Sequence, residues 1–226
     1  MCPLYSNTLP PELMRQLFQI DPSRDHLGNA QSLPSIFPKT MSPMVTIDPT
    51  GHRQLENAHW GFVLPQKSTR TGLPIQPKAV NNARDDKLRV SRFWKSSFEK
   101  RRCLVPATSF CEPKGKRPAT YFWFGLKGED PRPPFAFAGI WTLFDGIYGQ
   151  DPRKTLTSTI ITTKPNELVA EVHPDRMPVI LEPHNYQTWL TGSATEAFDL
   201  IEPLQAEKMT IHQSGAQMKS DHGATP

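Results

Sequence analysis

The residue that follows the initiator methionine is a cysteine, and this position gives it unusual chemical potential. If Met1 is removed, Cys2 carries a free α-amino group and a thiol on adjacent carbons. No residue inside a chain offers this pair of nucleophiles. The sequence therefore makes Cys2 a candidate covalent reagent.

Two further residues have neighbours that suit them to proton transfer. Glu112 directly follows an apolar run at 103–110, so its carboxylate is expected at a strand end against a partly buried wall, where desolvation raises a carboxyl pKa. His173 stands between a helix candidate and an apolar strand, beside Asp175. A surface glutamate in a charged turn and a solvated histidine are the alternatives for each residue taken alone.

Cationic and aromatic residues are interleaved between positions 84 and 102. The aromatic residues are Phe93 and Trp94, and the cations are Arg84, Arg89, Arg92, Lys95, Lys100, Arg101 and Arg102. Cations for phosphates and aromatic faces for bases are the two ingredients of single-stranded nucleic-acid binding. A solvated helix face with its aromatics in the core fits the segment equally well, because Asp85, Asp86 and Glu99 dilute the charge.

Composition sets the outer limits on function. The 226 residues carry a net charge of +4 and a pI near 9.0, which permits a polyanionic partner. The three cysteines are an odd number, and no apolar signal segment precedes them, so a reducing, cytoplasmic location without disulfides is expected. No apolar run approaches the roughly 18 residues of a membrane helix. Without a C-x-x-C pair or clustered histidines, neither a zinc site nor another cofactor is predicted.

The elements that position these residues are mostly strands, because 24 prolines and 13 glycines separate short apolar runs. Strands are predicted at 59–64, 103–110, 120–126, 135–144 and 155–163, and helices at 10–20, 91–102, 165–172 and 182–190. The first helix is expected to turn Leu13, Leu17 and Ile20 inward, and Trp94 and Phe98 are expected to face the core. Residues 21–43 read as a surface loop. We expect one α+β domain over 2–212, mainly antiparallel, and a mobile polar tail over 213–226.

Several short motifs, taken in order, resemble the SRAP family, the SOS response-associated peptidases. They are MC at 1–2, WGF at 60–62, NAR at 82–84, RRCLVPATSFCE at 101–112, TT at 162–163 and HPDRMPVIL at 173–181. The resemblance implies a strand-rich, barrel-like core. It also implies a monomer that binds single-stranded DNA, cleaves off its own methionine and crosslinks to abasic sites through the exposed cysteine.

The resemblance also assigns roles to individual residues. Cys2 is implied to be the nucleophile, and Asn82 to orient the reacting end. Glu112 is implied to be the catalytic carboxylate, and His173 the second acid or base. The implied DNA-binding residues are Arg84 and Arg176 on phosphates, Thr162 and Pro43 in the pocket, and Trp60 of the WGF motif.

The chemistry fits an aldehyde substrate. The open form of an abasic site is an aldehyde, and an amine and thiol on adjacent carbons close on it to a five-membered thiazolidine ring. The chain departs from the usual family pattern at Pro3 and Leu4, at Pro113, and in the two residues between His173 and Arg176. Two alternatives therefore stay open: a single-stranded DNA-binding module that does not crosslink, and a thiol peptidase that acts in trans.

Overall fold

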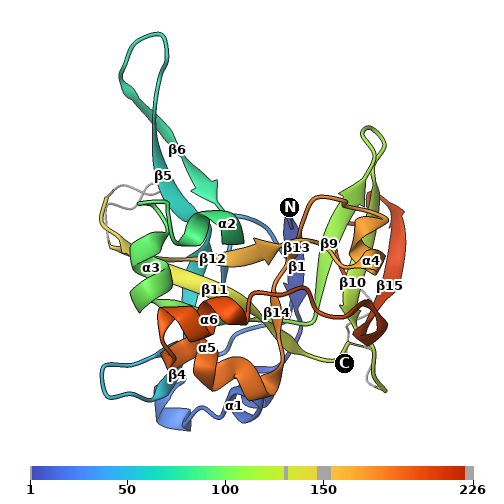
Figure 1. The fold of residues 1–226 in the computed structure, drawn as a ribbon, viewed down its shortest axis with the longest axis horizontal. Coiled ribbons are helices and arrows are strands. Elements are labelled where there is room, and N and C mark those ends of the chain that lie inside the picture. Colours follow the sequence, from blue (N-terminus) through green and yellow to red (C-terminus); the bar gives the residue numbers. More distant parts are fainter. Residues whose placement is uncertain (1, 130–131, 147–153, 222–226) are drawn as a thin grey trace.

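The centre of the computed structural model is a barrel of five strands (Figure 1). The structure describes residues 2–129, 132–146 and 154–221. The barrel strands are β3 (Met41–Ile47), β4 (Arg53–Trp60), β8 (Arg102–Ala107), β11 (Phe135–Phe144) and β12 (Thr155–Thr163). They pair in the order β12-β4-β3-β8-β11, and the barrel closes because β11 also pairs with β12.

A second sheet of five strands carries the start of the chain, in the order β15-β10-β9-β1-β2. Its strands are β1 (Leu4–Asn7), β2 (Leu33–Ile36), β9 (Ser109–Lys114), β10 (Thr120–Leu126) and β15 (Met209–Ala216). Only Thr108 separates β8 of the barrel from β9 of this sheet, so the run at 103–110 crosses from one sheet to the other. Buried aromatic rings fill the space between them, with Phe110, Phe124 and Phe137 in one cluster.

The remaining elements are short. The strands are β5 (Phe62–Lys67), β6 (Pro74–Val80), β7 (Asn82–Arg84), β13 (Met177–Pro178) and β14 (Ile180–Leu181). The α-helices are α1 (Pro11–Phe18), α2 (Asp85–Leu88), α3 (Lys95–Lys100), α4 (Glu167–Ala170), α5 (Tyr186–Thr191) and α6 (Ala194–Asp199), and 3₁₀ turns lie at Pro22–Arg24, Pro183–Asn185 and Ala206–Lys208. Within the described ranges, no helix has the length and apolar character needed to cross a membrane.

The strand-rich, mainly antiparallel α+β prediction is confirmed, as is the inward orientation of Trp94 and Phe98. The prediction of which face of the first helix is buried is wrong: Leu13 is 47% exposed, whereas Met14 is buried. Helix α1 ends at Phe18, so Ile20 is buried only after the helix has ended. The 21–43 segment is also not simply a loop, because β2 and the start of β3 lie in it.

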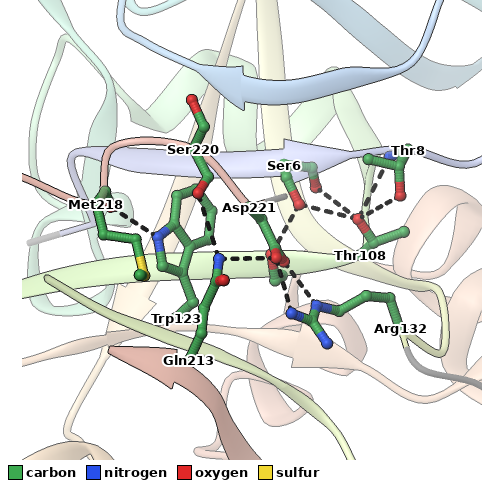
Figure 2. Close-up of polar contacts among 10 residues, drawn as sticks. Ser6, Thr8, Thr108, Trp123, Arg132, Gln213, Met218, Ser220 and Asp221 are labelled. Carbon is green, nitrogen blue, oxygen red and sulfur yellow. Dashed lines mark hydrogen bonds and ion pairs between the residues drawn. The ribbon is translucent and has the colours of Figure 1, made fainter. Parts of the chain in front are cut away.

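The C-terminal segment returns to the strands that begin the chain (Figure 2). Asp221 is buried and accepts hydrogen bonds from Ser109 Oγ at 2.5 Å and from Arg132 Nε at 2.7 Å. Its backbone N–H donates to the Pro34 carbonyl of β2. Ser109 Oγ in turn lies 2.7 Å from Ser6 Oγ of β1, so this network links both ends of the domain.

The polar residues after 212 therefore lie on the domain as far as 221, since β15 continues to Ala216 and pairs with β10. The rest of the expected tail, residues 222–226, lies outside the described residues.

Candidate active site

Cys2 is anchored by hydrogen bonds to its backbone and is fully buried. The side-chain amides of Asn81 and Asn82 both donate to its carbonyl oxygen, at 3.0 and 2.8 Å. Its Sγ donates to the Leu4 carbonyl at 3.4 Å. Burial raises the pKa of the thiol well above its ordinary value, and the nearby negative charge of Glu112 raises it further. The thiol is therefore protonated at neutral pH.

Glu112 lies beside Cys2 because strands β1 and β9 are paired. Leu4 of β1 stands opposite Cys111 of β9, and Glu112 is the next residue of β9. The carboxyl group is fully buried, and burial raises its pKa from 4.5 to about 7. A carboxyl that titrates near neutral pH can both donate and accept a proton under working conditions. The sequence predicted a carboxyl group against a partly buried wall, and in the structure the carboxyl group is fully buried.

Asn82 has a second polar atom directed into a buried space. Its Nδ2 holds the Cys2 carbonyl, while its Oδ1 is buried with no hydrogen-bond partner among the described residues. A buried amide oxygen without a partner is costly, so this atom can accept a hydrogen bond from a water or from a bound ligand. Asn82 begins β7, which pairs in parallel with β12 at Ile160. The barrel thus fixes the backbone that carries this amide.

The turn that carries His173 contacts the end of β9. Lys114 Nζ donates to the carbonyl of Glu171 at 2.6 Å, two residues before His173. The backbone N–H of Arg176 donates to His173 Nδ1 at 3.3 Å, so the neutral ring carries its proton on Nε2. Burial lowers the pKa of His173 below 6.5, which keeps the ring neutral at neutral pH. The two residues between His173 and Arg176 are accommodated in this turn.

Arg84 and Arg176, expected on phosphates, each contact an aspartate. Arg84 makes a bidentate contact with Asp86, at 2.9 and 3.0 Å, on the surface of the protein. Arg176 is mostly buried, where it donates to Asp85 and to both the hydroxyl and the carbonyl of Thr162. The two aspartates that dilute the charge in the sequence thus neutralise these two arginines individually.

Two of the remaining predicted residues, Trp60 and Thr162, contact residues of the site. Trp60 is fully buried, and its Nε1 donates to the Asn81 carbonyl at 3.0 Å, so the ring helps to position an amide that holds Cys2. Thr162 is buried and holds Arg176. Pro43 is buried in β3 opposite Asn57.

The basic segment 84–102 divides into structural and surface cations. Arg102 is buried and donates to the carbonyls of Trp189 and Phe98. Arg101 donates to the Trp141 carbonyl, and Arg89 lies 3.8 Å above the Phe198 ring. Much of this charge therefore satisfies carbonyls and rings of the protein itself.

Sequence reasoning missed the contribution of Asn81. Only the second asparagine of the Asn-Asn pair belongs to the NAR motif, yet both amides contact Cys2. The doubled asparagine was the available signal. The roles of Asp85 and Asp86 as partners of Arg176 and Arg84 had no signal beyond their proximity in the sequence.

Fold and site together define a class of protein: a small barrel domain in which the second residue is a cysteine, held by amides beside a buried acid. The comparisons with known proteins agree. The family model for SOS response associated peptidase (SRAP) matches residues 1–220. The chain belongs to the SRAP family.

Individual relatives cover most of the chain. The abasic site processing protein YoqW of Bacillus subtilis is 31% identical over 187 residues, which are 81% of this chain and 79% of YoqW. YobE from the same organism, also named an abasic site processing protein, is 30% identical over 181 residues, 78% of each chain. A crystal structure of a protein from Bordetella bronchiseptica matches with a TM-score of 0.72 at 22% identity, over 95% of this chain and 99% of that one, and shows the same fold.

Proposed function

We propose that this protein processes abasic sites in single-stranded DNA and captures them as a covalent thiazolidine through Cys2, after removing its own Met1. The observation that carries the proposal is the placement of Cys2, whose backbone is held by two amides and whose thiol lies beside a buried acid with a pKa of about 7. The names of the Bacillus relatives, which are called abasic site processing proteins, support the substrate.

The reaction proceeds in two steps that conserve all atoms. The free α-amine of Cys2 adds to the aldehyde carbon of the opened sugar, and loss of one water gives an imine. The thiol then adds across the carbon–nitrogen double bond, with sulfur bonding to carbon and the thiol proton passing to nitrogen. Because the thiol is protonated at neutral pH, the amine attacks first. The second attack is intramolecular, so the ring is durable.

Three side chains assist these steps. Glu112 supplies the proton with which the first adduct loses its hydroxyl as water, since its pKa lies near neutral pH. We assign His173 as the second acid or base; its ring is neutral at neutral pH and accepts the backbone N–H of Arg176 on Nδ1. Asn82 holds the Cys2 backbone without adding charge, and its unsatisfied Oδ1 is available to the incoming sugar. The same acid and amide serve the hydrolysis of the bond between Met1 and Cys2.

Phosphate binding falls to Arg84 and Arg176, which must exchange an aspartate for a phosphate. The Arg84 pair is exposed, and exposed ion pairs contribute little, so this exchange costs little. Trp60, Thr162 and Pro43 stay proposed DNA-binding residues, and Trp60 and Thr162 also hold Asn81 and Arg176 in place.

The thiol peptidase alternative is less well supported. A peptidase that acts in trans needs a thiolate, whereas burial and Glu112 hold the Cys2 thiol in its neutral form. We propose further that the protein acts as a monomer in the cytoplasm, close to the nucleoid in a bacterial host. In support of a reducing environment, Cys2, Cys103 and Cys111 are all free and buried.

The deciding experiment incubates the purified protein with an oligonucleotide that carries one abasic site and separates the products on a denaturing gel. The wild type should give a shifted covalent band, and its intact mass should lack Met1. Cys2→Ala should give no band but still bind the DNA in a native gel. Cys103→Ala, which alters another buried cysteine, is the matched control and should crosslink normally. Native binding by the wild type without any covalent band would leave only the DNA-binding module.

A further inference from the structure

The hairpin formed by β5 and β6 extends away from the body of the protein (Figure 1). It is a separate two-stranded sheet, and within the described residues no other strand pairs with it. Phe62 and Val63 anchor its base in the core, whereas residues 69–76 at its far end are all exposed. Isolated two-stranded hairpins are marginally stable, so such an arm is expected to have a use.

The hairpin is cationic. Residues 62–80 include Lys67, Arg70 and Lys78 and contain no aspartate or glutamate. Among the ion pairs of residues 2–129, 132–146 and 154–221, none involves these three cations. Arg84 and Arg176, by contrast, are each paired with an aspartate. The hairpin thus presents its cations to a polyanion, and no carboxylate has to be displaced before they bind it.

Prolines decide which kind of partner fits the hairpin. Pro65, Pro74 and Pro77 have no backbone N–H, and they interrupt the row of donors that an added β-strand would need. Near the far end, Leu73 is 65% exposed and Ile75 is 52% exposed. Exposed aliphatic side chains among cations suit the sugars and bases of a nucleic acid, whose phosphates meet the charges.

Both ends of the hairpin lead into the residues that hold Cys2. Trp60, two residues before Phe62, donates to the Asn81 carbonyl. After Val80 the chain continues directly into Asn81 and Asn82, which hold the Cys2 carbonyl. Gly61 has a φ of 122°, and a Cβ there would lie 2.8 Å from Ala79 Cβ, so glycine is required where the arm leaves the barrel. A strand bound at Cys2 therefore passes the base of the hairpin.

We infer that the β5–β6 hairpin is a DNA-binding arm that holds the backbone of the strand flanking the abasic site. This inference rests on the proposed function, which places DNA at Cys2. The arm extends from about residue 64 to residue 70, roughly 20 Å at the usual rise of a strand. At roughly 3.4 Å per stacked nucleotide, it reaches about six nucleotides on one side of the site.

The test is a triple variant with Lys67→Gln, Arg70→Gln and Lys78→Gln. Affinity for intact oligo-dT is measured against salt concentration, and again with abasic oligonucleotides whose flanks grow from two to twelve nucleotides on either side. For single strands each phosphate contact contributes about 0.7 to the slope of log affinity on log salt, so the slope should fall by about 2. At low salt the affinity should fall by about tenfold or more.

The wild type should gain affinity until one flank reaches about six nucleotides, and the triple variant should lose that gain. Its crosslinking rate at saturating DNA should equal the wild-type rate. A matched control replaces three exposed cations outside the hairpin, Lys116, Lys127 and Lys219, with glutamine; none of them is in an ion pair within the described residues. Equal slopes for the triple variant and this control would overturn the inference. A wild type that binds no single-stranded DNA would overturn the proposed function instead, so the two failures are distinguishable.

Discussion

Replacing Glu112 with glutamine should stabilise the protein at alkaline pH while it removes the proposed proton transfer. In the folded protein burial raises the Glu112 pKa from 4.5 to about 7. Between these two values the folded state holds a proton that the unfolded state has lost. The contribution of this residue is therefore greatest below pH 4.5 and is lost as the pH rises through 7. A pKa difference of about 2.5 corresponds to about 3 kcal/mol.

The amide of the Glu112→Gln variant does not titrate, so the variant escapes this loss. The difference in the free energy of unfolding, variant minus wild type, should become more positive by about 3 kcal/mol between pH 4.5 and pH 8.5. Urea unfolding followed by tryptophan fluorescence at the two pH values measures it. Intact masses ensure that proteins with the same N-terminus are compared.

Glu12→Gln is the control, because Glu12 is exposed on α1 and its replacement makes the same acid-to-amide change at the surface. In single-turnover crosslinking the Glu112→Gln variant should be slower by about 10²-fold or more. Parallel pH profiles for the wild type and the Glu112→Gln variant would refute the reasoning. They would show that the pKa of Glu112 is the same in the folded and unfolded states, so that the group is ionised at neutral pH and cannot be the proton donor there.

Three further perturbations have expected outcomes. Asp86→Asn frees Arg84 from its surface partner, so affinity for single-stranded DNA should rise a few fold at low salt in a fluorescence-anisotropy titration. Asp221→Asn leaves the Arg132 charge without its buried carboxylate, and urea unfolding should show a loss of about 3 kcal/mol. His173→Ala should slow crosslinking and change its pH–rate profile in the acid range, because burial lowers the pKa of the imidazole from its ordinary value; an unchanged profile would exclude its role.

Most of the strand framework could be predicted from the sequence, because apolar β-branched and aromatic runs bounded by glycine and proline are a local signal. The runs at 120–126, 135–144 and 155–163 coincide with β10, β11 and β12. Their closure into a barrel has no such signal. It depends on the parallel pairing of β12 with β4, between residues about 100 positions apart, which only the folded chain defines.

The residue types of the candidate site could be predicted from the sequence, but the ion pairs of its side chains could not. Cys2 and Glu112 were candidates from their places in the sequence and Asn82 through the family motifs, and the structure brings the three together. The pairing of Arg84 and Arg176 with aspartates could not be predicted, since ion pairs depend on side-chain direction. The β5–β6 hairpin was not predicted as a hairpin: only its first residues fall within the strand predicted at 59–64, which the structure divides at Gly61 between β4 and β5, and three prolines between 65 and 77 interrupt the strand signal that follows.

The contact of Asp221 with the first strands has a consequence for biosynthesis. β1 leaves the ribosome well before residue 221, yet the ion pair with Arg132 and the hydrogen bond to Pro34 need that residue, which lies more than 200 positions further along the chain. The nascent chain therefore carries Cys2 on an incomplete sheet until synthesis has passed this aspartate. A premature stop codon at position 221 would remove the carboxylate that binds Arg132 and the donor to Pro34, so the truncated protein should be more accessible to quality-control proteases although Cys2, Asn82 and Glu112 are intact.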